Sequence, residues 1–218
     1  MWIMESFSDK IKMTMASMSP TQLAEYYSNW AENMGYEKEM NEGKFRASTI
    51  VADEMAACFP ENRDQLQIMD IACGTGRVGT ALAAYGFTNI DGLDSSSGML
   101  NVCMKTGHYN NLYEEYCGYN TLPIQDDVYD CLGVAGGIGG SHIPCSGIME
   151  MIRIVKPGGL IVIAMRKEYE ERVGKDIEDM DALISTAENK NMAELVDRRE
   201  VDKYFVDRDG ILFKIRAK

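Results

Sequence analysis

Residues 68–76 read IMDIACGTG, an apolar run that carries one acid, Asp70, and ends in a glycine-rich turn. The segment that follows, RVGTALAAYG at 77–86, has the composition of a helix. Glycine lets a backbone approach a ligand where a Cβ atom would collide, and the start of a helix offers unpaired N–H groups. A strand, a glycine turn and a helix in this order are therefore typical of a cofactor-binding site.

Composition limits the class of protein. The 218 residues are 45% apolar and 26% charged, which suits one globular domain with a sizeable core. The 34 acidic and 22 basic residues give a net charge of −12, and nucleic-acid phosphates or anionic membranes repel such a surface. We therefore expect a small-molecule substrate, no nucleic acid and no membrane partner. The sequence predicts no particular oligomeric state.

The start of the chain and its cysteines favour a cytoplasmic protein. No apolar run approaches the roughly 20 residues that span a bilayer. Residues 1–18 are rich in methionine but interrupted by charges, which predicts a flexible lead-in and no signal peptide. The six cysteines form no CxxC pair and show no metal-ligand spacing, so we expect reduced thiols and no metal site.

From residue 67 onward, strand-like and helix-like segments alternate, as a parallel sheet with crossover helices requires. Strands are expected at 67–72, 89–93, 111–116, 130–135 and 160–165. Helices are expected between them at 77–85, 97–105 and 144–154. A charged helix over 167–190 follows, and then two alternating runs, 199–206 and 210–216, that predict an antiparallel hairpin. The predicted fold class is α/β, a Rossmann-like, doubly wound and mostly parallel sheet that ends in this hairpin.

Two helices are expected ahead of the sheet. Ser19, Pro20 and Gln22 have the pattern of a helix start with a capping box, and this helix should run to about Asn33. A second helix fits 43–58. We expect a single domain over 19–218, in which a helical lid at 19–60 precedes an α/β core at 61–218.

A second signal lies in the turn after the first strand. Residues 74–79, GTGRVG, match GxGxxG, and Asp94 ends the next strand, where an acid reaches the hydroxyls of a ribose. The alternative is that Asp94 only caps the helix that follows it. On this pattern alone, a nicotinamide-dependent oxidoreductase is one possible function.

Further segments stand in a recurring order along the chain. They are IDGLD with SSSGML from residue 90, VYDCLGVAGG from 128, MIRIVKPGGLIVIA from 151, and the opening YYSNWAEN at 26–33. Together with IMDIACGTG they resemble the motifs of class I S-adenosylmethionine-dependent methyltransferases, and most closely the Williams–Beuren-region methyltransferase-like proteins. The resemblance extends over about residues 22–165. It implies the class I methyltransferase fold, with S-adenosyl-L-methionine as cofactor and S-adenosyl-L-homocysteine as product.

The resemblance also implies roles for single residues. The methionine part of the cofactor would face Asp70, Cys73, Gly74, Thr75 and Gly76. The ribose would bind Asp94, and the adenine would lie beside Ser95 and Met99. The sulfonium and the methyl acceptor would border Ala135 and Gly136. The cofactor carboxylate would pair with Arg46, whose guanidinium fork suits a carboxylate.

Two parts of the implied site depart from the family pattern. The opening has Ser28 where relatives have Asp, and its aromatic residues Tyr27, Trp30 and Tyr36 would form part of a lid over the sulfonium. Plain helix packing is the alternative for these aromatics. Many relatives carry an acid–Ala pair beside the adenine, and here the corresponding stretch contains Tyr119, Asn120 and Thr121. These three residues are our candidates for the adenine contacts.

The acceptor side is expected after the fourth strand, where residues 136–142 read GGIGGSH. His142 is our candidate general base for a hydroxyl or amine acceptor, with a structural loop histidine as the alternative. The leading hypothesis is a methyltransferase that transfers the methyl group to a small-molecule N, O or S acceptor. A regulatory module that binds S-adenosylmethionine without catalysis is a second hypothesis.

Overall fold

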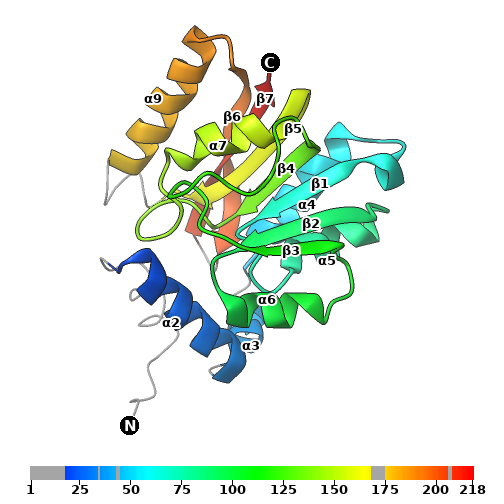
Figure 1. Cartoon of the computed structure of the whole chain (residues 1–218), viewed down its shortest axis with the longest axis vertical. Helices are drawn as coiled ribbons and strands as arrows, with labels where there is room; N and C mark the ends of the chain where they lie inside the picture. Colours follow the sequence, from blue (N-terminus) through cyan, green and yellow to red (C-terminus); the bar gives the residue numbers. More distant parts are fainter. Residues whose placement is uncertain (1–17, 34, 43–44, 168–174, 206–207) are drawn as a thin grey trace.

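The computed structural model describes residues 18–33, 35–42, 45–167, 175–205 and 208–218. At its centre lies a seven-stranded sheet of order β3-β2-β1-β4-β5-β7-β6 (Figure 1). The strands are β1 (Gln67–Ile71), β2 (Asn89–Asp94), β3 (Asn111–Glu114), β4 (Tyr129–Ala135), β5 (Val155–Arg166), β6 (Ala193–Phe205) and β7 (Arg208–Ala217). The first five strands run parallel, whereas β7 is antiparallel to both β5 and β6. The predicted sheet and its C-terminal hairpin are confirmed.

Helices cover both faces of the sheet. They are α2 (Pro20–Asn33), α3 (Tyr36–Glu42), α4 (Ala47–Cys58), α5 (Arg77–Ala84), α6 (Ser97–Met104), α7 (Gly147–Ile154) and α9 (Lys175–Asn189), with a 3₁₀ turn at Arg63–Gln65. Side chains of a strand alternate between the faces. On β1, Met69 and Ile71 pack into the core under α7 and α9, while Ile68 packs into the core under α4 and α5. No helix in the described ranges is both long and apolar enough to cross a membrane.

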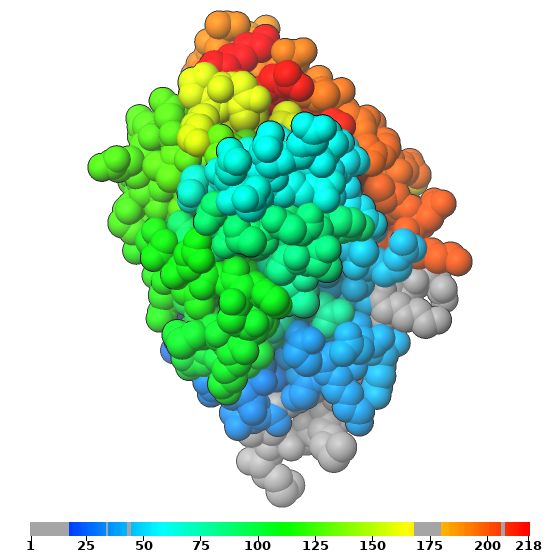
Figure 2. Space-filling model, turned by 90° about the vertical axis from the view of Figure 1, so that its right-hand side faces the viewer, coloured from blue at the N-terminus to red at the C-terminus, as the bar shows by residue number. Residues whose placement is uncertain are grey.

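The helices α2 and α3, which we call the lid, stand at one end of the sheet (Figure 1). The predicted capping box is present at the start of α2, where Ser19 N donates to Gln22 Oε1 at 2.9 Å and Gln22 N to Ser19 Oγ at 3.3 Å. Helix α2 contacts α6, and Figure 2 shows the blue lid residues beside the green surface at the lower end of the molecule. Helix α4, which was expected within the lid segment, packs instead against β4, β5 and α5. Of the predicted lead-in, only Met18 lies within the described residues.

The strand order creates a crevice at one edge of the sheet. The chain moves outward from β1 to β3 and then crosses back to β4, so the winding direction reverses between β1 and β4. In register, Ile71 of β1 lies beside Leu93 of β2 and Val134 of β4, so the carboxyl ends of the three strands meet. Open α/β sheets bind their ligands at such a reversal point.

Candidate functional site

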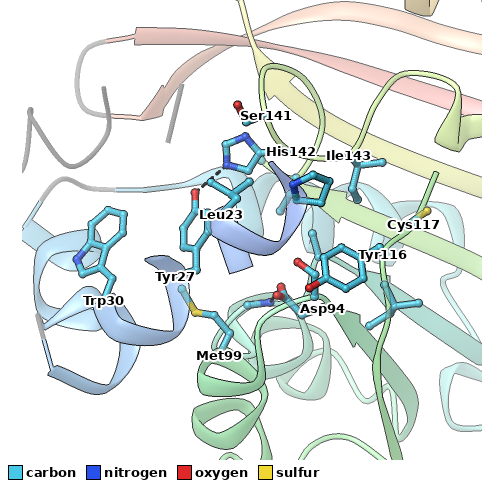
Figure 3. Close-up of a pocket in the computed structure, with 18 of the residues that line it drawn as sticks. Leu23, Tyr27, Trp30, Asp94, Met99, Tyr116, Cys117, Ser141, His142 and Ile143 are labelled. Carbon is cyan, nitrogen blue, oxygen red and sulfur yellow. Dashed lines mark hydrogen bonds between the residues drawn. The ribbon is translucent and has the colours of Figure 1, made fainter. Parts of the chain in front are cut away.

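A pocket lies at this reversal point, beneath the lid (Figure 3). Its empty space is about 940 Å³ when the open mouth is included, which is within the range of small-molecule sites. The walls come from residues at or just beyond the carboxyl ends of β1, β2, β4 and β5, and the cover comes from α2 and α3.

The glycines of the turn after β1 have different tasks. Gly74 lines the pocket with a φ of +54°, and a Cβ atom there would meet nothing within 4 Å. A Cβ atom at Gly79 would lie 2.4 Å from the ring of Tyr109, and one at Gly76 would lie 3.1 Å from the same ring. Gly74 therefore leaves room for a ligand, whereas Gly76 and Gly79 make room for Tyr109.

Tyr109 connects this turn to the acid of β1. Its hydroxyl donates to Asp70 Oδ2 at 2.6 Å and accepts from the backbone N–H of Gly79 at 2.9 Å. Burial raises the pKa of Asp70 to about 7, and the hydrogen bond from Tyr109 opposes that shift. Asp70 is fully buried and does not line the pocket. In this structure it supports the turn through Tyr109 and does not itself face the cavity.

Asp94 lies in the pocket wall at the end of β2. Its Oδ2 accepts from Gly74 N and its Oδ1 from Ser96 N, both at 2.9 Å. Burial raises the pKa of Asp94 to about 6, against the effect of these backbone hydrogen bonds. The cap of α6 is Ser96, whose Oγ accepts from Met99 N at 3.1 Å. Asp94 thus ties the glycine turn to the start of α6, with its carboxylate in the pocket wall.

The three predicted lid aromatics pack on one another and also line the pocket. The rings of Tyr27 and Trp30 are stacked at 5.9 Å between centroids, and Tyr36 meets Trp30 edge-on at 5.0 Å. Trp30 Nε1 donates to Glu39 Oε2 at 2.7 Å, which links α2 to α3. The packing alternative and the lid prediction therefore describe the same cluster.

The lid is held to the core at two points. Ser28 Oγ lies 2.9 Å from Ser96 Oγ and accepts from Gly98 N at 3.2 Å. A Cβ atom at Gly98 would lie 2.6 Å from the Ser28 Cα, so the small residues at these two positions allow α2 to approach α6 closely. On α3, Glu37 accepts a hydrogen bond from Thr75 Oγ1 and pairs with Arg77 at 2.7 Å. Both contacts join the lid to core segments that also contain pocket-lining residues.

His142 links the loop after β4 to the lid (Figure 3). Its Nδ1 lies 3.1 Å from the carbonyl oxygen of Gly139, and its Nε2 lies 2.8 Å from the Tyr27 hydroxyl. Because a carbonyl only accepts, Nδ1 carries the proton and Nε2 accepts from Tyr27. Burial, aided by the charge of Arg166, lowers the pKa of His142 to about 4. The ring is therefore neutral, and its accepting nitrogen bonds to Tyr27.

The structure brings most of the predicted site residues into one pocket. Those that line it are Tyr27, Trp30, Tyr36, Gly74, Asp94, Ser95, Met99, Tyr119, Ala135, Gly136 and His142. Those outside the lining are Arg46, Asp70, Cys73, Thr75, Gly76, Asn120 and Thr121. Arg46 is exposed at the start of α4, and Asn120 and Thr121 are exposed beyond the rim. Cys73 is buried 4.0 Å from Cys103 Sγ, and all six cysteines are free.

Several lining residues were not predicted from the sequence. Glu115, Tyr116 and Cys117 follow β3 and line the pocket on the side of Asp94. The sequence could have indicated these residues, because they directly follow a predicted strand and the pocket wall is formed where the parallel strands end. Phe45, Arg166 and Phe205 line it from the other side, and no motif marked them. The described residues contain no group of three or more side chains suited to hold a metal ion.

Comparisons with known proteins agree with this geometry. Residues 68–159 match the family described as "Methyltransferase domain". The human methyltransferase-like protein 27 is 31% identical over 145 residues, which is 66% of this chain and 58% of that protein. A demethylmenaquinone methyltransferase of Clavibacter sepedonicus is 36% identical over 98 residues, or 44% of this chain and 40% of that protein. The chain spans about half the length of the curated relatives it matches.

Solved structures share the fold. A chain in the complex of the Haloferax volcanii Trm112 methyltransferase activator with a methyltransferase has a TM-score of 0.63 and 17% identity, with 88% of this chain and 97% of that chain covered. A TehB-like S-adenosylmethionine-dependent methyltransferase of Corynebacterium glutamicum has a TM-score of 0.56 and 15% identity, with 77% of this chain and 86% of that chain covered. These structures show the fold alone, whereas the sequence matches identify a methyltransferase domain of the S-adenosylmethionine-dependent class I.

Proposed function

We propose that this chain, which carries a methyltransferase domain of the S-adenosylmethionine-dependent class I, transfers a methyl group to a small-molecule N, O or S acceptor. The observation that carries the proposal is the pocket itself, with Gly74 and Asp94 on one side, the lid above it, and a second, mostly apolar side beyond β4. The C-terminal hairpin and the family match favour this function over a nicotinamide-dependent oxidoreductase.

The residues on the Asp94 side, which we call the cofactor half, fit an S-adenosyl nucleoside. The space over Gly74 is open, and the carboxylate of Asp94, which lines the pocket, would accept from the two ribose hydroxyls. Met99, Glu115 and Tyr116 would surround the adenine. The aromatic rings of the lid favour a positively charged sulfonium and exclude water from it.

The bound cofactor would supply an activated methyl group, which leaves sulfur as the acceptor's lone pair forms the new bond. The protein's task is then to hold the acceptor atom in line with the sulfur–methyl bond and to keep water out. Ala135 and Gly136 border the position where transfer would take place. If the acceptor loses a proton, that proton must pass to a nearby base or to solvent.

The properties of His142 restrict which kinds of acceptor atom the pocket could activate. Its low pKa and its hydrogen bond from Tyr27 make it a weak base in this conformation. Acceptors whose nucleophilic atom already has a free lone pair, such as a neutral amine, a thiolate or a carboxylate, need no strong base. A hydroxyl acceptor would reach His142 only through Tyr27 or after Tyr27 moves.

The pocket beneath the lid and the charge of −12 favour a small acceptor over a polynucleotide. Relatives named for demethylmenaquinone are consistent with this choice. We also propose a cytoplasmic location, on the basis of the six free cysteines.

The test has two stages. Calorimetry should first show that S-adenosylhomocysteine binds and that NADH does not. Methyl-labelled S-adenosylmethionine is then incubated with the protein and a metabolite extract, and the label should enter a small molecule. Binding without any transfer, in the presence of extract, would favour the regulatory module. Tight NADH binding without a response to S-adenosylhomocysteine would contradict the proposal.

A further inference from the structure

The side of the pocket beyond β4 differs in charge from the cofactor half. We call it the acceptor half, and we assign to it the described lining residues Pro20, Leu23, Phe45, Ser141, His142, Arg166 and Phe205. No carboxylate occurs in this set, whereas the cofactor half contains Asp94 and Glu115. Arg166 is therefore the charged side chain of the acceptor half, in a protein whose net charge is −12.

Arg166 is held by its surroundings. It is the last residue of β5 and lies opposite Gly210 of β7 in register. Its Cζ atom lies 5.2 Å from the centroid of the Phe205 ring, a distance at which the ring attracts a guanidinium. Its charge also reaches His142, whose pKa is lowered mainly by burial and further by this charge. The guanidinium is thus partly fixed in position before any ligand arrives.

Arg166 lies far from the ribose site. Between the strand of Asp94 and the strand of Arg166 stand β1 and β4, and three strand spacings amount to about 14 Å. A nucleoside bound at Asp94 with its sulfonium near Ala135 would leave Arg166 on the acceptor side of the methyl group. The first turn of α2 lies on this side too, with Pro20 and Leu23 in the lining, and a helix start adds partial positive charge.

We propose that Arg166 binds the carboxylate of the methyl acceptor, so that the substrates are small organic acids with an apolar or aromatic body. The guanidinium fork matches a carboxylate with two parallel hydrogen bonds. Phe45, Phe205 and Leu23 would contact the apolar body. The neutral His142 adds no competing charge. This inference rests on the proposed function and names the substrate class of the same site.

Benzoate and benzamide test the inference without the natural substrate. Both are titrated into the protein with and without S-adenosylhomocysteine, and binding is followed by NMR or calorimetry. Benzoate should bind about tenfold more tightly than benzamide, a preference of about 1.4 kcal/mol. Arg166→Gln should abolish the preference, and Arg166→Lys should keep part of it because the charge remains without the fork. Arg216→Gln is the matched control, since Arg216 is exposed at the far end of the β5–β7 pair.

Three results would overturn the inference. The first two are equal affinity of the wild type for benzoate and benzamide, and a preference for benzoate that remains in Arg166→Gln. The third is a loss of S-adenosylhomocysteine affinity of about tenfold in Arg166→Gln. The last result would place Arg166 on the cofactor's own carboxylate. The labelled product offers a second readout. A carboxylate that binds Arg166 and is not itself methylated keeps its negative charge, so an anion-exchange column at neutral pH should retain the labelled product. Failure of the proposed function would look different, since wild-type protein would then bind no nucleoside or transfer no label.

Discussion

The cofactor half and the acceptor half of the pocket are built in different ways. In the cofactor half, Gly74 follows β1 and Asp94 ends the neighbouring strand β2, and the backbone N–H of Gly74 donates to the Asp94 carboxylate. In the acceptor half, Phe45 precedes Arg166 and Phe205 by more than a hundred residues, and the three side chains meet only through tertiary packing. The first arrangement follows from the local order of strand, turn and helix, whereas the second depends on how distant segments pack.

The largest effect is expected in the cofactor half. Asp94→Ala should weaken S-adenosylhomocysteine binding by about a hundredfold, because two hydrogen bonds to a charged acceptor are worth about 1.5 kcal/mol each. Calorimetry measures the loss, and Asp202→Ala, at an exposed position on β6, is the control. Unchanged affinity in Asp94→Ala would mean that the ribose site lies elsewhere.

A smaller effect separates the glycines of the turn. Gly79→Ala should destabilise the fold by about 2 kcal/mol, because the new methyl group overlaps the Tyr109 ring. Gly74→Ala should cost about 1 kcal/mol from its positive φ, while its methyl group enters the cofactor space. Chemical denaturation and nucleoside titration are measured on both variants. If Gly74→Ala and Gly79→Ala lost the same stability and bound the nucleoside equally well, the two glycines would not have the separate roles assigned to them here.

The pH dependence gives the next effect. Burial raises the pKa of Asp94 to about 6, and the ionised form is the one that accepts from ribose hydroxyls. Protonation removes that form, so affinity for S-adenosylhomocysteine should be constant above this value and fall by about tenfold for each pH unit below it. Asp94→Asn should bind weakly with a flat profile over the same range. A profile in Asp94→Asn that still follows the wild type would assign the dependence to another group, with Asp70 as the first candidate.

The smallest effect on cofactor binding is expected from the acceptor half. His142→Ala should change the affinity for S-adenosylhomocysteine by less than about threefold, because the ring bonds to Tyr27 and Gly139. Tyr27→Phe, which removes the same hydrogen bond from the lid side, is the matched variant. Turnover should fall in His142→Ala for a hydroxyl acceptor and stay intact for one that needs no base. A large loss of nucleoside affinity in His142→Ala would move this residue into the cofactor half.

The same contrast explains what could be predicted from the sequence. Alternation of apolar strands and helices predicted the sheet, and the motif order led to Gly74 and Asp94, because both depend on local pattern. Arg46 was placed in the site by motif position alone, and in the structure it is exposed at the start of α4. The adenine candidates Asn120 and Thr121 were located from the Leu-Pro pair that follows them, whereas the pocket is lined by Glu115 and Tyr116, nearer to β3.

Arg166 and Phe205 show most clearly which site residues could not be predicted from the sequence. Both end strands that the sequence predicted, yet nothing in their local pattern says that β6 would bring Phe205 beside Arg166. The role of Gly79 is a second example, because a GxGxxG match indicates a phosphate or nucleotide loop, and only the structure shows that Tyr109 occupies the space. Residues set by tertiary packing therefore had to come from the structure.

The most direct test is a crystal structure of the protein with S-adenosylhomocysteine. The ribose hydroxyls should lie within hydrogen-bond distance of the Asp94 carboxylate, with the nucleoside over Gly74 and its sulfur beside Ala135. Arg166 should then lie in the acceptor half, on the side of the sulfur atom that faces away from the ribose. A cavity that stays empty at saturating nucleoside, or a nucleoside bound away from the carboxyl ends of β1 and β2, would contradict this assignment.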